Sequence, residues 1–334
     1  MKDANGTVWV DNSTLTDVAA CTTRTVLKKV YGFQRAEDGI AAEAGKAFHT
    51  ALDVRFQGRG NDAALAAFRA AYAEYNARVV EPAANERDKY DLYRMANLER
   101  IVREWLTRHP DSALPWTVLP DGTEAELSHP LTDETLPNGA PRFMYWGKID
   151  LRVRAHHDGR RYTVDHKTSQ KIDAANLAKY DNDSQMTGYT FLESKLSPPD
   201  DQPAGVFINA IGIKDVPSSN RKCSTHGMLY AQCGHLHLDF VIQPTGRRPD
   251  QVEAWRRNAA TFAAQYADMI DAYGNDLASV ADAPMDGTFR NECKFCSFRT
   301  FCLSRRDDVD TLHANFVVDR WLPKALQPPQ ENAA

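Results

Sequence analysis

Two extended segments joined by a tight turn constrain the fold of this chain more than any other feature. Apolar side chains fall at alternate positions of residues 142–155 (RFMYWGKIDLRVRA), and residues 162–168 (YTVDHKT) form a second extended segment. Between them, Asp158-Gly159 is a pair typical of tight turns. Alternation with period 2 is typical of strands with one buried face. The sequence therefore predicts a β-hairpin over residues 142–168.

The second strand ends in an acid and a lysine two residues apart. Side chains at i and i+2 of a strand point to the same face, so Asp165 and Lys167 are expected side by side, with His166 on the other face. Asp150 falls on the polar face of the first strand. Two carboxylates on paired strands can share a hard cation such as Mg²⁺ or Mn²⁺, and without one they raise each other's pKa. A surface ion pair worth under about 1 kcal/mol is the alternative interpretation.

Helices are predicted on both sides of this hairpin. The expected helices cover residues 13–31, 43–56, 61–80, 88–108, 173–195 and 249–277, and further strands cover 205–213 and 235–243. This order predicts a mixed α/β core at 116–245, between helical segments at 1–115 and 246–321, in one integrated domain. The tail at 322–334, rich in Pro, Gln and Ala, is expected to be disordered.

Composition and charge limit the class of protein. The 334 residues are 43% hydrophobic and 25% charged, which is ordinary for a globular chain with a substantial core. No segment approaches the roughly 18 apolar residues of a membrane span, and no secretory signal is visible, so a cytoplasmic location is expected. The formal charge of −5 argues against a wide basic surface that coats DNA. The cations considered for a local basic groove, or else for a solvated surface, are Arg24, Lys28, Lys29 and Arg152.

Two further motifs flank the hairpin in the sequence. The stretch EAGKAFH places His49 on a predicted helix, with Gly45 allowing a close approach. The stretch SQMTGY places Gln185 and Tyr189 four residues apart, on one face of the helix that follows the hairpin. A lone histidine is more often a packed structural residue, and a lone Gln/Tyr pair is commonplace. Their combination in this order around the hairpin is not commonplace.

In this order the motifs resemble the RecB-like branch of the PD-(D/E)xK nucleases, which includes AddB-type nuclease domains and CRISPR-associated adaptation exonucleases. The branch carries G-x3-H, G-x-x-D, (D/E)-x-K and Q-x3-Y, and this chain has all four in sequence. They are Gly45 to His49, GKID ending in Asp150, DHK at 165–167, and Gln185 to Tyr189. The usual proline before the first acid is replaced, since the motif reads WGKID. The resemblance implies a mixed α/β, restriction-endonuclease-like core.

The resemblance also implies roles for these residues. The ligands of the divalent metal, Mg²⁺ or Mn²⁺, would be His49, Asp150, Asp165 and the main-chain carbonyl of His166. Lys167 would position or activate the attacking water, and Gln185 and Tyr189 would contact the nucleic acid near the scissile phosphate. The implied activity is that of a DNA nuclease, expected to be an exonuclease on single-stranded DNA or DNA ends, in recombination, repair or CRISPR spacer acquisition.

The cysteines form a second constellation. Three of the six are closely spaced, as Cys293-x2-Cys296-x5-Cys302. This spacing is a metal signature, because Cys-x2-Cys lets two thiolates reach one ion or cluster. No fourth ligand lies nearby, and on sequence grounds Cys21, Cys223 and Cys233 compete for that place.

The resemblance distinguishes among these candidates. A subset of RecB-like nucleases carries one cysteine before the core and C-x2-C-x5-C after it, and the four together hold a 4Fe–4S cluster. The resemblance therefore implies Cys21 as the fourth ligand and a cluster that ties together the two helical segments. A zinc ion at the same four cysteines is the alternative. Cys223 and Cys233 would then be non-ligands, or would form a small zinc site with loop histidines between 226 and 237.

Two other functions remain open on the sequence. A non-catalytic nucleic-acid-binding scaffold would keep the fold, although none of the expected catalytic residues is missing. A structure-specific endonuclease is the second alternative. No G-x4-G-K-(S/T) motif of a helicase occurs, so a nuclease of this kind would act alone or with a helicase, CRISPR or recombination partner that supplies unwinding.

Overall fold

A computed structural model describes the chain at residues 1–35, 39–78, 92–214, 222, 226–229, 232, 238–304, 306, 309–320, 323 and 326. The chain divides into two compact units, which are described separately. The first comprises Met1–Glu37, Glu126–Lys148 and Arg248–Ala334, and the second comprises Asp38–Ala125 and Ile149–Arg247. Two long strands therefore contribute to both units: β3 (Trp116–Pro130) and β4 (Phe143–Ala155).

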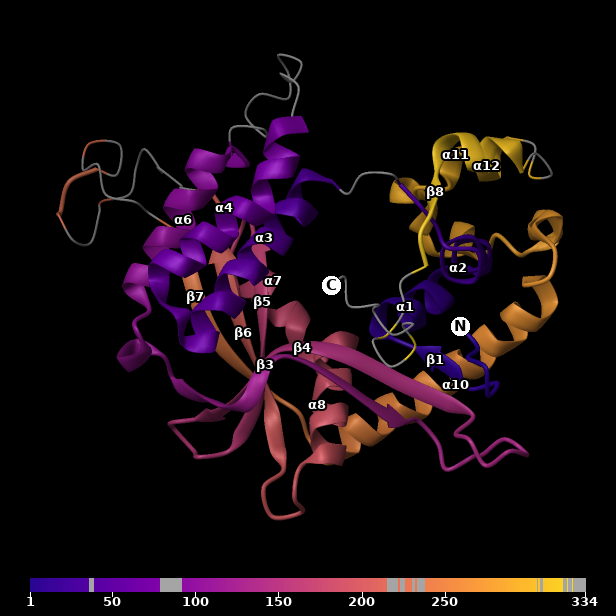
Figure 1. The fold of residues 1–334 in the computed structure, drawn as a ribbon, viewed down its shortest axis with the longest axis horizontal. Coiled ribbons are helices and arrows are strands. Elements are labelled where there is room, and N and C mark those ends of the chain that lie inside the picture. The colour runs from indigo at the N-terminus through magenta and orange to yellow at the C-terminus, as the bar shows by residue number, and fades with distance from the viewer. Residues whose placement is uncertain are drawn as a thin grey trace, which may run out of the picture. The chain divides into compact units, whose positions relative to one another are not determined.

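A mixed sheet organises the second unit (Figure 1). Strand β5 (Arg161–Ser169) pairs antiparallel with β4 and parallel with β6 (Pro203–Gly212). Strand β7 (Phe240–Gly246) pairs antiparallel with β6, and β3 pairs with β4. Gly159 makes the predicted turn between β4 and β5 with a positive φ of 68°. The predicted mixed α/β fold is confirmed.

Helices cover both faces of this sheet. On one face lie α3 (Ile40–Val54), α4 (Gly60–Arg78) and α6 (Met95–Arg108), and on the other lie α7 (Ala174–Ala178), η4 (Lys179–Asn182) and α8 (Ser184–Leu196). Strand β6 shows both contacts. Its residues Phe207 and Ile211 pack with α3, α4 and α6, whereas Val206, Ile208 and Ala210 pack with Tyr180 and Met186. All ten residues of β6 are buried, as expected for a strand covered on two faces.

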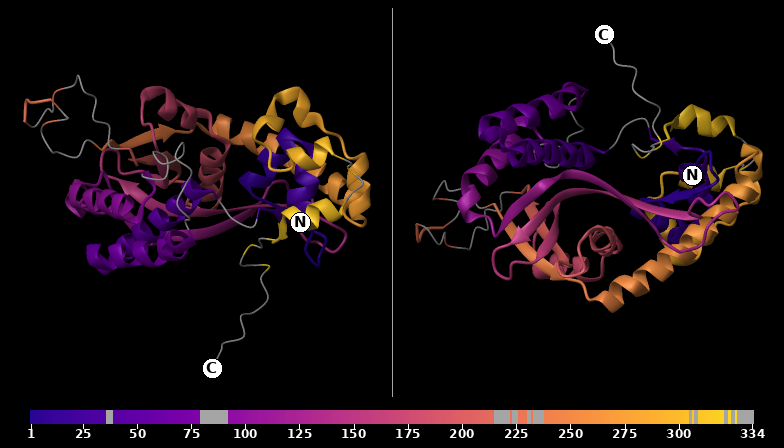
Figure 2. Two further views of the ribbon diagram at one scale, coloured as in Figure 1. Left: turned by 90° about the horizontal axis from the view of Figure 1, so that it is seen from above. Right: turned by 60° about the horizontal axis from the view of Figure 1, so that its bottom comes forward.

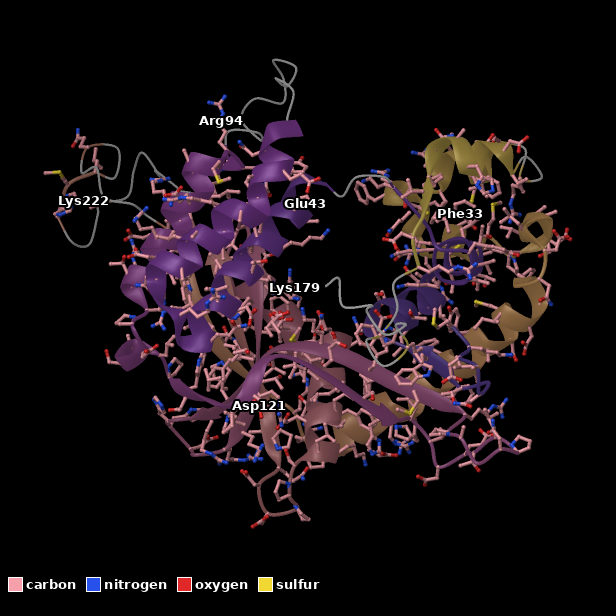
Figure 3. The ribbon with its side chains drawn as sticks, viewed as in Figure 1. Phe33, Glu43, Arg94, Asp121, Lys179 and Lys222 are labelled. Carbon is pink, nitrogen blue, oxygen red and sulfur yellow. The ribbon has the colours of Figure 1, made fainter. Side chains whose placement is uncertain are left out.

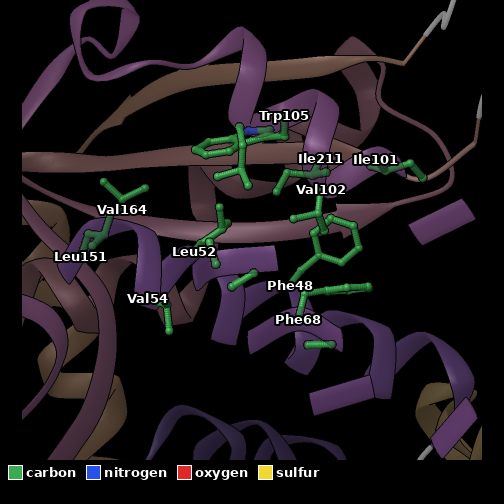
Figure 4. Packing of buried hydrophobic residues seen from close by; sticks show 14 of the residues in the cluster. Phe48, Leu52, Val54, Phe68, Ile101, Val102, Trp105, Leu151, Val164 and Ile211 are labelled. Carbon is green, nitrogen blue, oxygen red and sulfur yellow. The ribbon is translucent and has the colours of Figure 1, made fainter. Parts of the chain in front are cut away.

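The core beneath α3, α4 and α6 explains how the helices are held (Figure 4). Phe48 and Leu52 of α3 are buried one turn apart and pack with Phe68 of α4 and Trp105 of α6. The short π-helical turn η2 (Arg55–Arg59) links α3 to α4, and Gly58 within it has a left-handed φ of 79° that glycine adopts without strain. The single 3₁₀ turn η3 (Asp111–Ala113) follows α6.

The first unit is mostly helical. Strand β1 (Val8–Val10) pairs in parallel with the beginning of β4. The helical elements that follow are α1 (Asn12–Ala20), α2 (Thr22–Thr25), η1 (Val26–Val30), the long α10 (Pro249–Tyr273) seen in Figure 2, η5 (Leu277–Asp282), η6 (Asp286–Arg290), η7 (Glu292–Phe295), α11 (Arg299–Leu303) and α12 (Asp310–Asn315). A two-stranded sheet joins β2 (Phe33–Gln34) to β8 (Val317–Val318).

Two predicted helices are interrupted in the structure. The helix predicted at 13–31 breaks at Cys21, which is extended (φ −166°, ψ 125°). Here the amides of Thr22 and Thr23 bond to the Asp286 carboxylate and the Pro284 carbonyl, instead of continuing the helix. The helix predicted at 173–195 is split into α7, η4 and α8, because Asp183 caps a new helix by accepting hydrogen bonds from two amides of α8.

Several predictions fall on residues outside the described ranges. These are Cys223 and Cys233, the first residues of the helix predicted at 88–108, the first residues of the strand predicted at 235–243, and most of the tail. Among the helices that are described, none is long and apolar enough to cross a membrane.

Candidate active site

The structure brings His49 of α3 against the polar face of β4 and the main chain of β5. The Asp150 carboxylate accepts a 2.8 Å hydrogen bond from the backbone amide of His166 through Oδ2. Its Oδ1 lies 3.3 Å from Nδ1 of His49, and Nε2 of His49 lies 2.9 Å from the carbonyl oxygen of His166. Three of the four groups that the sequence analysis assigned to the metal therefore meet at the His49 ring, whereas Asp165 contacts Lys167.

Lys167 links strand β5 to helix α8. Its Nζ lies 2.9 Å from Oδ2 of Asp165 and donates a 3.1 Å hydrogen bond to Oε1 of Gln185. The amide of Gln185 in turn donates a 2.8 Å hydrogen bond to the hydroxyl of Tyr189. Asp165 and Lys167 are thus on the face of β5 that α8 covers, and the four residues form one polar chain.

His166 points its ring to the opposite face, into the core. The ring stacks on Phe56, with centroids 5.8 Å apart, and its Nδ1 accepts a 2.8 Å hydrogen bond from the side-chain amide of Asn209. Trp105 completes the arrangement by donating to Asn209 at 3.2 Å. Burial lowers the pKa of His166 to about 3, so the ring is neutral, with its proton on Nε2. These contacts fix the direction of the His166 carbonyl toward His49.

Glu124 of β3 belongs to the same site, and the sequence analysis missed it. Each of the residues Glu124, His49 and Asp150 offers one possible ligand atom, and these three atoms all lie within 4.8 Å of one another. The strand bends here, since Asp121 (marked in Figure 3) and Glu124 have left-handed φ values of 50° and 48°. A side chain on Gly122 would come within 2.7 Å of the Arg152 carbonyl oxygen, so this bend requires glycine. A glycine within a strand was the only available signal, and it does not name Glu124.

The buried carboxylates perturb one another and their neighbours. Burial, together with the charge of Asp150, raises the pKa of Asp165 to about 6 despite the nearby Lys167. Burial also opposes ionisation of Asp150, but the hydrogen bond and charge of His49 outweigh it and lower that pKa to about 2. The same contact overcomes burial at His49 and raises its pKa to about 9. Burial opposes the charge of Lys167, but Asp165 raises the lysine's pKa above its usual value.

This donor set fits a hard divalent cation. The oxygen donors that surround His49 are the Asp150 and Glu124 carboxylates and the His166 carbonyl, and carboxylate and carbonyl oxygens are the donors that Mg²⁺ and Mn²⁺ prefer. In the metal-free protein a protonated His49 offsets the negative charge of Asp150. Metal ligation requires the neutral imidazole, so a bound cation would release this proton.

The cations considered for a basic groove are instead committed to carboxylates. Each of the four lies no more than 3.9 Å from one: Arg24, Lys28 and Lys29 approach Asp17, and Arg152 approaches Glu193. These four residues therefore offer little free positive charge for a phosphate backbone.

All four candidate cluster cysteines lie in the first unit, and none forms a disulfide. Cys21 is buried at the break between α1 and α2, Cys293 lies in η7, Cys296 follows it and Cys302 lies in α11. Burial, with a smaller contribution from the three other cysteines, raises the pKa of the Cys302 thiol to about 11. The thiols are therefore neighbours, but within the described chain no three of the sulfur atoms lie within 4.8 Å of one another.

A mixed sheet whose paired strands carry two buried carboxylates and a lysine, with a histidine from a preceding helix, is the arrangement of a metal-dependent nuclease. Comparison with protein families agrees. The family model of the PD-(D/E)XK nuclease superfamily matches residues 12–303, and the chain belongs to this superfamily. A search of curated protein sequences found no significant match.

Proposed function

We propose that this protein is a DNA exonuclease of the RecB-like type that hydrolyses phosphodiester bonds in single-stranded DNA or at DNA ends. The observation that carries the proposal is the continuous polar chain from Asp165 through Lys167 and Gln185 to Tyr189, beside the His49–Asp150 contact. A scaffold that only bound DNA would not need two buried carboxylates beside a half-buried lysine at this cost in desolvation.

The residues of the site would have two roles, metal binding and orientation of the attacking water. His49, Asp150, Asp165, the His166 carbonyl and Glu124 would hold Mg²⁺ or Mn²⁺. When bound, the ion supplies an activated water and polarises the phosphate. The Lys167 ammonium, held by Asp165 and Gln185, orients that water and offsets negative charge as it develops on the phosphorus oxygens. Direct in-line attack inverts the configuration at phosphorus.

Gln185 and Tyr189 position rather than react. Gln185 accepts a hydrogen bond from Lys167 with its carbonyl and donates to Tyr189 with its amide, so Tyr189 helps to hold the Gln185 carbonyl toward the lysine. We propose that the two residues also contact the strand next to the scissile phosphate. A helicase, CRISPR or recombination partner would supply the unwinding.

A cleavage assay tests the proposal. With Mn²⁺ and end-labelled single-stranded DNA, Lys167→Ala and Asp165→Ala are expected to lose at least about 100-fold in rate, the scale of a lost charge-stabilising group. The matched control is Lys171→Ala, because Lys171 is an exposed lysine on the next turn of chain, paired with Asp173. Parent-like rates for both active-site variants would exclude the nuclease and favour the scaffold.

The form of the substrate separates an exonuclease from an endonuclease. An exonuclease degrades a linear single strand and leaves a circular strand of the same sequence intact, because the circle has no end. Equal degradation of the linear and circular strands would instead show the structure-specific or non-specific endonuclease.

We further propose that Cys21, Cys293, Cys296 and Cys302 hold a 4Fe–4S cluster. Around one tetrahedral zinc ion, with Zn–S bonds of about 2.3 Å, the thiolates stand about 3.8 Å apart. Among the described residues no three of these sulfurs approach within 4.8 Å, although the thiols influence one another electrostatically. A four-iron cluster binds each thiolate through a different iron and therefore suits the wider spacing.

Metal analysis of anaerobically purified protein distinguishes the two metals. The cluster predicts iron and acid-labile sulfide in equal amounts, a brown colour, and loss of both in Cys296→Ser. Cys223→Ser serves as the control and should keep them. A colourless protein that contains zinc would overturn the cluster while leaving the nuclease proposal intact.

A further inference from the structure

Two aromatic rings of the first unit are almost fully in solvent. The side chains of Phe289 in η6 and Phe295 in η7 are 92% and 87% exposed. Across the described ranges, these are the only Phe, Tyr or Trp residues in the exposed class. Phe298 and Phe301 of the same segment are buried with Phe33 in the core of this unit. The cysteine segment thus separates its aromatic residues into an inner and an outer set.

The backbone holds the outer rings on short, well-defined turns. Elements η6 and η7 are single 3₁₀ turns that pack against each other, and Asn291 joins them with a left-handed φ of 57°. Asparagine tolerates this conformation better than most residues. On the inner side, Gly287 of η6 packs directly against Cys21. The segment that carries the two exposed rings is therefore held in place by the contact of Gly287 with Cys21.

The sequence of this segment is basic, although the chain as a whole is acidic. Residues 286–306 contain five basic and two acidic residues, while the formal charge of the chain is −5. Both acids are engaged: Asp286 accepts from the backbone amide of Thr22, and Glu292 pairs with Arg24 at 3.2 Å.

Exposed cations lie close to the two rings in the sequence. They are Arg290, Lys294 and Arg299. None of them forms an ion pair with a carboxylate of the described chain, and Nζ of Lys294 lies 5.2 Å from the centroid of the Phe295 ring.

We propose that Phe289, Phe295 and Lys294 form a binding surface for single-stranded DNA, on which the rings stack against unpaired bases and the lysine contacts the phosphates. The choice of DNA rests on the proposed nuclease function. Exposed aromatic rings with positive charge beside them are the recognition elements of sequence-tolerant single-strand binding. An apolar partner protein would account for the rings but not for the cations. This surface would hold the strand whether or not it is being cut.

Binding and cleavage can be measured separately. The binding assay follows the fluorescence anisotropy of a labelled oligothymidylate in the Lys167→Ala background, in which the probe is not cut. Phe289→Ala and Phe295→Ala are each expected to weaken binding about tenfold, the size of one lost base stack. The matched control is Leu303→Ala, since Leu303 is a 75% exposed apolar residue of the same segment that has no ring. Its affinity should stay within about twofold of that of the Lys167→Ala protein.

Three further arms make the outcome decisive. Phe295→Trp should retain tight binding, which shows that a ring is needed and guards against loss of the local fold. On an abasic strand of the same length, the Phe→Ala variants should bind as the Lys167→Ala protein does, since no base is left to stack. Lys294→Ala should reduce the salt dependence of binding by about one phosphate contact.

Two results would overturn the surface. One is unchanged affinity of the Phe→Ala variants for oligothymidylate. The other is a change from dimer to monomer in light scattering with DNA affinity unaltered, which would assign the rings to contact between copies of this chain. A protein that fails to cut DNA with Mn²⁺ yet shows the ring dependence would refute the nuclease proposal and leave this surface standing.

Discussion

The backbone amide of His166 donates a hydrogen bond to the side chain of Asp150 on the neighbouring strand. His166 is the residue between the acid and the lysine of the D-x-K motif, and its own side chain points into the core. Its main chain nevertheless contacts both partners of the site, because the amide binds Asp150 and the carbonyl faces His49. The intervening residue of the motif therefore acts through its backbone, and any side chain that keeps this backbone in place can serve.

Glu124→Gln should weaken Mn²⁺ binding about tenfold, because a neutral amide replaces a carboxylate that stands within 4.8 Å of His49 and Asp150 donor atoms. Isothermal titration calorimetry of the apoprotein with Mn²⁺ measures the change directly. The control is Asp121→Asn, which lies in the same bend and shares its left-handed backbone. Equal affinities of the parent and Glu124→Gln proteins would remove Glu124 from the ligand set.

Asp165→Asn should stabilise the metal-free protein by about 1–2 kcal/mol at neutral pH. The pKa of Asp165 is about 6 in the folded protein, above its value of about 3.9 in the unfolded chain. The folded state therefore binds this proton more tightly, and stability is lost as the pH rises from about 4 through about 6. Urea denaturation at pH 5 and pH 7.5 should show the advantage of the variant shrinking at the lower pH.

Mn²⁺ provides the counterpart to that experiment. It should raise the stability of the parent protein more than that of Asp165→Asn, because binding to the folded state stabilises it by linkage. If Asp165→Asn were less stable than the parent protein at neutral pH without metal, burial and the charge of Asp150 would not disfavour the ionised form of Asp165.

Glu193→Gln should destabilise the second unit by about 2–4 kcal/mol. The Glu193 side chain is fully buried at the end of α8, 2.7 Å from Nε of Arg152 and 3.3 Å from a guanidinium nitrogen of Arg161. Loss of its charge leaves Arg152 without a carboxylate partner among the described residues, whereas Arg161 keeps its contact with Asp201. Chemical denaturation compared with the exposed-pair variant Glu253→Gln provides the measurement, and similar small losses in both would refute the prediction.

Gly287→Ala should disturb the cysteine site without unfolding the chain. A β-carbon at this position would stand 2.9 Å from Cβ and 3.2 Å from Sγ of Cys21, so Cys21 would have to move. We expect a lower metal content per chain, measured by elemental analysis. Gly39→Ala is the control, since a β-carbon there would meet nothing within 4 Å. Full metal occupancy in Gly287→Ala would show that the position of Cys21 does not matter.

The hairpin, the helices around it and the proximity of the motif residues were accessible from sequence because each depends on a short-range pattern. Alternation over 142–155 sets the face of every residue in β4, and pairing with β5 then brings Asp150 beside His166 without further information. In the same way, a four-residue spacing on one helix suffices to place Gln185 against Tyr189.

The features that escaped prediction depend on partners distant in sequence. At the helix break beside Cys21, the amides of Thr22 and Thr23 donate hydrogen bonds to acceptors near residue 285, more than 250 positions away. Glu124 enters the site only because two residues of β3 take left-handed backbone angles. The Trp105–Asn209–His166 chain joins three elements whose residues carry no shared motif. No local pattern encodes contacts of this kind.

The first unit is assembled from segments far apart in the sequence, and this has a consequence for biosynthesis. Gly287, which packs against Cys21, follows it 266 positions later in the chain. At about 5–20 residues per second, the ribosome needs roughly 13–53 s to cover that distance. Through that interval the thiol of Cys21 has none of its native neighbours from the later segment. The second unit, which ends at Arg247, can therefore fold before residues from Arg248 onward are available to the first unit.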